Sequence, residues 1–198
     1  MKQTADNVVF SNWKGKNTFR RKPVSYNDAK TAVQVSNRSK FKQIVLMCSA
    51  LLIMVRVGFK SFANGVTTSN AAVKFCLDKV LNLTTLTKTD YLTMAVSQGS
   101  LATVAPITEA FTGQTGVIDI EWNDNSNGVN AFTDDILYVG GYDITTGAGG
   151  AVQTSETRAD GITAVTIPQL IGAQPNNVVV FYFFKKATGT DVSDSQSF

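Results

Sequence analysis

The 198-residue chain contains no histidine. Its absence removes Ser-His-Asp and Cys-His catalysis, together with the side chain that most often binds transition metals. An enzyme would then need paired carboxylates, and Asp134 and Asp135 do stand side by side. Neighbours in a strand point to opposite faces, however, and at the entry to a strand such a pair is typical of a turn. We therefore expect no enzyme, no metal site and no cofactor.

Long apolar runs and cysteines are also scarce. The longest apolar run covers residues 44–55 between Lys42 and Arg56, and a membrane span needs roughly 20 residues. We expect a buried core helix there and no membrane span. Cys48 and Cys76 both fall in apolar helical patterns, which favours two buried thiols but leaves a bond between them open. Residues 1–15 lack the apolar segment of a signal peptide, so we expect synthesis in the cytoplasm.

Charge is divided unevenly along the chain. Residues 1–88 hold 15 Lys or Arg against 3 acids, whereas residues 89–198 hold 3 against 12. Opposite charges of this kind can bind a polyanion through the basic half, or can drive head-to-tail contact between copies. The alternative is two differently charged surfaces that face only solvent.

Residues 1–26 alternate weakly and then become basic, which predicts a short strand or hairpin followed by an extended arm. Cations are interleaved there with Trp13 and Phe19, as expected where phosphates meet cations and bases stack on aromatic rings. An arm that packs on a neighbouring subunit fits equally well. The candidate contact residues are Lys14, Lys16, Arg20, Arg21 and Lys22.

Two helices are expected next. Apolar residues at spacings of three and four over residues 41–59 predict one continuous helix, ended by Gly58. A second apolar stripe over residues 72–81 predicts a helix capped by one of residues 67–69, so that the two form an antiparallel pair. The first helix is apolar on more than one side. We therefore expect Met47, Leu51 and Met54 to form an assembly face against a second helix or a neighbouring subunit.

From residue 89 onwards, short β-rich segments alternate with Gly, Asn, Asp and Pro. This pattern predicts a β-sandwich with Trp122 in its core. Residues 178–184 are apolar on both faces, which predicts a central strand or one whose outer face is covered by the helices or another subunit. The expected strands cover residues 91–97, 117–123, 136–140, 151–155, 162–167, 178–185 and 192–197. The fold class is therefore α+β: a basic arm and helical pair (residues 1–88), followed by an immunoglobulin-like antiparallel β-sandwich (residues 89–198).

Two loops have possible ligand signals. Residues 123–134, NDNSNGVNAFTD, place Asn, Gly and Asp at some calcium-loop positions. The first position is Asn instead of Asp, and strands flank the segment, so we favour a hairpin loop. The glycines of residues 140–150 lack a phosphate-binding context and predict a surface loop. Gly140, Gly141 and Tyr142 are its candidate contact residues.

The order of several short motifs supports a resemblance. These motifs are WKG (13–15), RSKF (38–41), RVGFK (56–60), NAAV (70–73), SQGSL (97–101), EWNDNSNG (121–128) and DILYVGGYD (135–143). The chain resembles an uncharacterised family of about this length that is common in flavobacteria and their relatives. Its C-terminal half resembles immunoglobulin-like or fibronectin-like sandwiches, a fold shared by adhesion, phage-tail and capsid-decoration modules.

These observations predict a non-enzymatic structural subunit of a larger assembly, most readily a phage or phage-like virion protein of the capsid, decoration or tail. Its partners would be copies of itself or other virion subunits, and its location the assembled particle. Two alternatives stay open. One is a surface adhesion or glycan- or protein-binding module, and the other is a nucleic-acid-binding protein that uses the basic arm.

Overall fold

The computed structural model describes residues 8–22, 28–80, 83 and 85–198, without the side chain of Trp13. Contacts between residues divide the chain into two compact units, Met1–Gln34 and Val35–Phe198. The second unit contains nearly all of the helical residues together with the two larger sheets. The boundary expected between residues 88 and 89 therefore does not coincide with this division.

The first unit contains an antiparallel hairpin of β1 (Val8–Trp13) and β2 (Lys16–Arg21). Lys14 and Gly15 connect the strands with φ values of 51° and 78°. Two successive positive φ angles define the type I′ turn, whose twist matches that of paired strands. The predicted hairpin is therefore confirmed, whereas most of the arm that was expected after it, at residues 23–27, lies outside the described residues.

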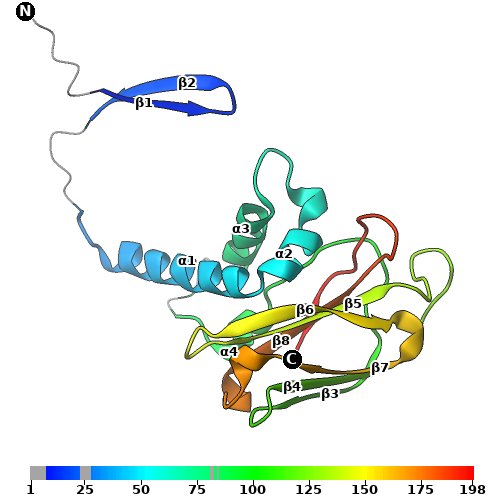
Figure 1. Cartoon of the computed structure of the whole chain (residues 1–198). Helices are drawn as coiled ribbons and strands as arrows, with labels where there is room; N and C mark the ends of the chain where they lie inside the picture. Colours follow the sequence, from blue (N-terminus) through cyan, green and yellow to red (C-terminus); the bar gives the residue numbers. More distant parts are fainter. Residues whose placement is uncertain (1–7, 23–27, 81–82, 84) are drawn as a thin grey trace, which may run out of the picture. The chain divides into compact units, whose positions relative to one another are not determined.

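The second unit has three layers: helices, a four-stranded sheet and a three-stranded sheet (Figure 1). The helices are α1 (Ala32–Ala50), α2 (Leu52–Gly58), α3 (Thr68–Val80) and α4 (Lys88–Leu92). The four-stranded sheet has the order β6 (Gly149–Thr157), β5 (Ile136–Asp143), β8 (Val178–Lys185), β9 (Gln196–Ser197). The other has the order β3 (Pro106–Thr112), β4 (Val117–Trp122), β7 (Ile162–Thr166). Short 3₁₀ turns are η2 (Lys60–Phe62), η3 (Arg158–Asp160), η4 (Pro168–Leu170) and η5 (Pro175–Asn177). The α+β class is confirmed.

The strand order is immunoglobulin-like. β4 pairs with β3 and β7, and β5 pairs with β8, which in turn pairs with β9. These neighbours correspond to strands A-B-E and C-F-G of the immunoglobulin sandwich. The remaining strand, β6, pairs with β5 instead of joining β7. The sandwich therefore has three strands in one sheet and four in the other.

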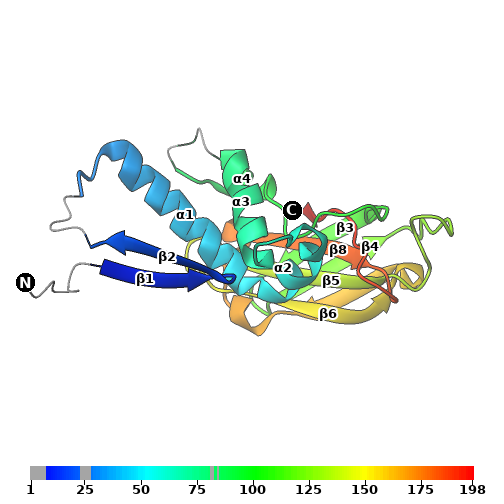
Figure 2. The same ribbon diagram turned by 90° about the horizontal axis from the view of Figure 1, so that it is seen from above.

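Helices cover the outer face of the four-stranded sheet, and α2 contacts both β5 and β6 (Figure 2). This cover explains why β8 is apolar on both faces. Val179, Phe181 and Phe183 pack in one core with the helices, whereas Val180 and Phe184 pack in a second core with the other sheet. The predicted central strand is confirmed.

Trp122 anchors the second core, as the sequence predicts. Its side chain is 2% exposed, and its ring lies 5.9 Å from that of Phe184 in an edge-on arrangement. The indole Nε1 donates a hydrogen bond to the Arg158 carbonyl at 2.8 Å. A buried indole therefore has its only donor satisfied.

The predicted single helix over residues 41–59 is wrong, because the chain bends by 89° between α1 and α2. Leu51 stands at the bend and is fully buried. The bend allows both limbs to bury apolar side chains in one core, Ile44 and Cys48 from α1 and Val55 from α2. Among the described residues, no single helix has the length and hydropathy to span a membrane. Only α1 and α2 taken together, as a bent pair, have both.

The strand expected over residues 91–97 is also wrong. Thr87 and Asp90 form a capping box, in which the Thr87 N–H donates to the Asp90 carboxylate at 2.7 Å, and the helix α4 follows. A reciprocal cap of this kind satisfies two donors at a helix start. A strand that the sequence did not predict, β3, occurs instead at Pro106–Thr112, and the last strand is reduced to Gln196–Ser197.

Candidate interaction surfaces

The β1–β2 hairpin exposes an aromatic pair. Phe10 and Phe19 lie opposite each other in the register, with ring centroids 6.4 Å apart. Their side chains are 75% and 76% exposed. An isolated two-stranded hairpin is marginally stable in water and needs a third strand or a packing surface. The hairpin therefore presents apolar surface suited to a partner.

The same hairpin is strongly cationic. The five predicted contact cations all fall within its strands and turn or directly after them, and residues 8–22 contain no acid. Arg21 pairs with Val8 and Arg20 pairs with Val9, so that each face of the hairpin carries an arginine. The structure thus brings the predicted strip together as Lys14, Lys16, Arg20, Arg21 and Lys22 on one exposed element.

The outer face of the three-stranded sheet has the opposite charge. Asp119 and Glu121 of β4 point outward, and the strands β3, β4 and β7 contain no Lys or Arg. The third acid of these strands, Glu109, lies opposite Ile120 on the inner face and accepts a hydrogen bond from the Tyr182 hydroxyl. In the register, Asp119 lies between Ala110 of β3 and Ala164 of β7. Small side chains therefore flank a carboxylate at the centre of this face.

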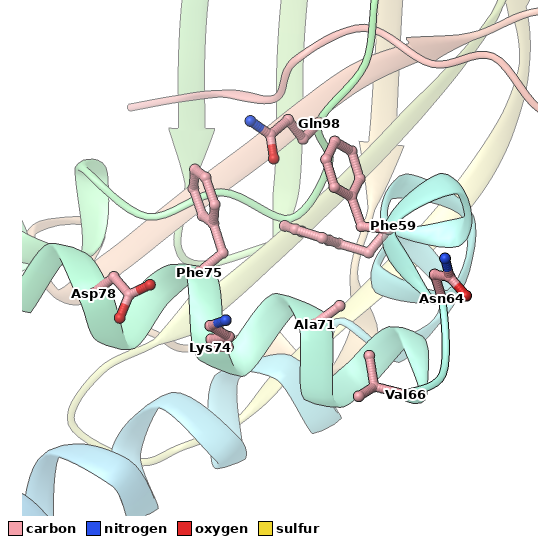
Figure 3. Close-up of a pocket in the computed structure, with 9 residues that line it drawn as sticks. Phe59, Asn64, Val66, Ala71, Lys74, Phe75, Asp78 and Gln98 are labelled. Carbon is pink, nitrogen blue, oxygen red and sulfur yellow. The ribbon is translucent and has the colours of Figure 1, made fainter.

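An aromatic pocket opens between α3 and the segment after α2 (Figure 3). It has a volume of about 360 Å³. The Phe59 ring lies 5.8 Å from that of Phe75 and 6.0 Å from that of Phe62. Lys74 and Asp78 lie along its α3 side (Figure 3). The pocket is suited to an apolar side chain of a partner, since three phenylalanines, Val66 and Ala71 line it.

The predicted assembly face is not on the surface. Met47, Leu51 and Met54 are all fully buried and pack in the core between the helices and the four-stranded sheet. Leu46 and Ile53 are exposed instead, by 44% and 51%. The same core contains Ala72 and Cys76 of α3, so the predicted contact with a second helix agrees with the structure, whereas a contact with a neighbouring subunit does not.

The predicted loop contacts are also misplaced. Gly140, Gly141 and Tyr142 lie in the central strand β5 and are buried. A Cβ at Gly140 would stand 2.7 Å from the Met54 sulfur, and one at Gly141 would stand 2.5 Å from a Leu170 methyl group. These glycines therefore permit close packing on both faces of a strand instead of forming a loop.

The segment 123–134 is a loop, but it connects β4 of one sheet to β5 of the other, so the predicted hairpin is wrong. The Asn127 Oδ1 accepts hydrogen bonds from the backbone of Val129, Asn130 and Ala131 at 2.9, 3.1 and 3.2 Å. Gly128 has a φ of 71°. Within the described part of the chain, no cluster of three or more His, Cys, Asp or Glu could hold a metal ion.

A buried ion pair lies beside this loop, and no pattern in the sequence predicts it. Arg158 and Asp135 have fully buried side chains, joined by a 3.0 Å contact from Nη2 to Oδ2. Arg158 also donates to the Ala102 carbonyl at 2.9 Å and to Asn125, and it stacks 4.1 Å from the Phe184 ring. Burial lowers the pKa of Arg158 from its usual value, and the Asp135 carboxylate opposes that shift. The pair and its hydrogen bonds therefore link the segments that contain Ala102, Asn125 and Asp135 at one end of the sandwich.

The two cysteines are free and buried. The Cys76 thiol donates to the Ala95 carbonyl at 3.4 Å. The pKa of the Cys48 thiol is raised mainly by its hydrogen bond with Cys76, and burial raises it further. The hydrogen bond and the burial therefore both disfavour the reactive thiolate form of Cys48.

The fold and these surfaces define a helix-covered, immunoglobulin-like β-sandwich that also has a cationic hairpin. The chain belongs to DUF6266, a family of unknown function whose family model matches residues 1–198. No significant match was found among curated proteins or among solved structures. The predicted resemblance to an uncharacterised family is thus confirmed at the level of the family.

Proposed function

We propose that this protein is a non-enzymatic structural subunit that assembles with copies of itself, of the kind that builds the capsid, decoration or tail of phage or phage-like particles. The observation that carries the proposal is the hairpin face on which Phe10 and Phe19 are 75% and 76% exposed. By the resemblance in its sequence, the assembly would belong to flavobacteria and their relatives.

Two energetic arguments support assembly. Burying an aromatic side chain that is otherwise exposed contributes about 1.5–3 kcal/mol, and two lie side by side on the hairpin. The opposite charges of the basic hairpin and the acidic three-stranded sheet attract when they belong to different copies, and this attraction directs the encounter. A subunit that recognises its own kind in this way requires no catalytic group.

Light scattering on the full chain over a micromolar concentration series tests the proposal. We expect a mass above that of the monomer, and a return to the monomer in the double variant Phe10→Ser, Phe19→Ser. The matched control is Val129→Ser, which removes an apolar side chain that is 82% exposed in a loop. This control should assemble normally. A wild-type protein that stays monomeric throughout the series would overturn the proposal.

Nucleic-acid binding by the hairpin is the second candidate, favoured by the five cations beside exposed aromatic rings. It predicts that affinity for a single-stranded oligonucleotide falls steeply with salt. The triple variant Arg20→Ala, Arg21→Ala, Lys22→Ala should then flatten this dependence. Salt-dependent binding by a protein that remains monomeric would favour this candidate over self-assembly.

A further inference from the structure

We infer that the β1–β2 hairpin of one copy adds to the exposed edge of β3 in a second copy, which extends the three-stranded sheet across the subunit boundary. This inference rests on the proposed self-assembly and specifies its two contact surfaces. Strand addition of this kind obtains its affinity from main-chain hydrogen bonds and its specificity from side chains.

The choice of β3 follows from a comparison of the edge strands of the two sheets, among the described residues. In the four-stranded sheet, β6 contacts α2 and η4 and has only two exposed residues out of nine, and β9 has only two residues in all. In the other sheet, β7 has five residues and β3 has seven, six of them exposed. A long exposed edge strand is a template for pairing, because one row of its backbone groups has no strand beside it.

The hairpin fits this edge in length. Each of its strands has six residues, against seven in β3. β1 and β2 use one edge each to pair with each other, so that each has a second edge for another strand. A sheet of three or more strands is stable where a two-stranded hairpin is marginal. Docking on β3 would supply that third strand.

Charge selects the hairpin as the occupant. A strand beside β3 would lie about 10 Å from β4, two strand spacings away. Asp119 and Glu121 of β4 would therefore be within reach of the hairpin's long cationic side chains. Glu109 lies on the inner face of β3, where it accepts from the Tyr182 hydroxyl, but it is exposed and makes this edge more acidic. Two β3 edges that approached each other would therefore bring like charges together. Such repulsion discourages pairing between identical edges and leaves the cationic hairpin as the favoured partner.

The contact would join two different surfaces of identical chains. A head-to-tail contact of this type closes into a ring or continues as a filament, depending on the rotation between neighbours. Either product suits a structural subunit of a particle.

Disulfide trapping between separately prepared variants tests the inference. One set has a cysteine on each face of each hairpin strand: Ser11→Cys, Asn12→Cys, Asn17→Cys and Thr18→Cys. Each is mixed with Ala110→Cys on β3 or with its matched control Ala164→Cys on β7, and oxidised with copper phenanthroline. Both alanines are exposed, and both lie opposite Asp119.

We expect at least one hairpin variant to form a mixed dimer with Ala110→Cys at a yield at least tenfold above that with Ala164→Cys. Mass spectrometry of the linked peptides identifies the pair. Equal yields at the two positions, or none at Ala110→Cys while light scattering still shows assembly, would overturn the β3 contact alone. Monomers throughout in light scattering would instead overturn the proposed function, and the β3 contact with it.

Discussion

Replacing Asp135 by alanine should be strongly destabilising. The carboxylate Oδ2 accepts from Arg158 Nε at 3.1 Å and from the Phe132 N–H at 2.9 Å, and it lies 3.0 Å from Arg158 Nη2. The substitution would leave a fully buried guanidinium without its counter-ion, which costs about 3–5 kcal/mol. Carbonyl partners such as Ala102 remain in place, so we expect the lower end, about 3 kcal/mol. This loss corresponds to a fall in Tm of about 6–12 °C.

The neighbouring Asp134 is the matched control, because it is exposed. Asp134→Ala should change the free energy of unfolding by no more than about 0.5 kcal/mol. Asp135→Asn keeps an acceptor for Arg158 but loses the charge, so we expect an intermediate value. Urea unfolding followed by tryptophan fluorescence measures all three variants. A loss below about 1 kcal/mol for Asp135→Ala, or equal losses for the two alanine variants, would show that the Arg158–Asp135 pair does not stabilise the fold.

Two further predictions concern the helices. Met54→Glu should prevent folding because Met54 is fully buried, whereas Ile53→Glu should preserve the fold because Ile53 is 51% exposed. Circular dichroism compares the two variants. A folded Met54→Glu protein would contradict the burial of Met54. Neither Cys48 nor Cys76 should react with Ellman's reagent in the native protein, since both are buried and free. In denaturant two thiols should react, and any rapid reaction before unfolding would show that a thiol is accessible.

Much of the sandwich could be predicted because its strands follow simple patterns. β4 alternates Ile118 and Ile120 inward with acids outward, and the apolar run of β8 has the same bounds as predicted. β3 escaped detection because six of its seven residues are exposed, so no period-two apolar pattern marks it. The helix α4 was misread as a strand because its start depends on a capping box at Thr87, while Tyr91 and Met94 suggested an apolar strand.

The surfaces were harder to predict than the strands. The contact residues of the hairpin could be predicted because its cations and aromatic residues are local in sequence. The assembly face was misassigned because α1 and α2 are apolar on several sides, and only the packed sheet decides that Met54 is buried and Ile53 exposed. Gly140 suggested a loop, yet its missing side chain makes room for Met54. Contacts between segments far apart in the chain leave no local signal of this kind.

Hydrogen exchange at two protein concentrations, one below and one above the onset of assembly, tests most directly whether the hairpin docks on β3 of another copy. Amide protection reports local opening of each segment. We predict that protection of residues 8–21 and of residues 106–112 rises together with concentration, while the buried strand β8 is unchanged. Unchanged exchange in both segments while the particle mass grows would show that the hairpin does not dock on β3.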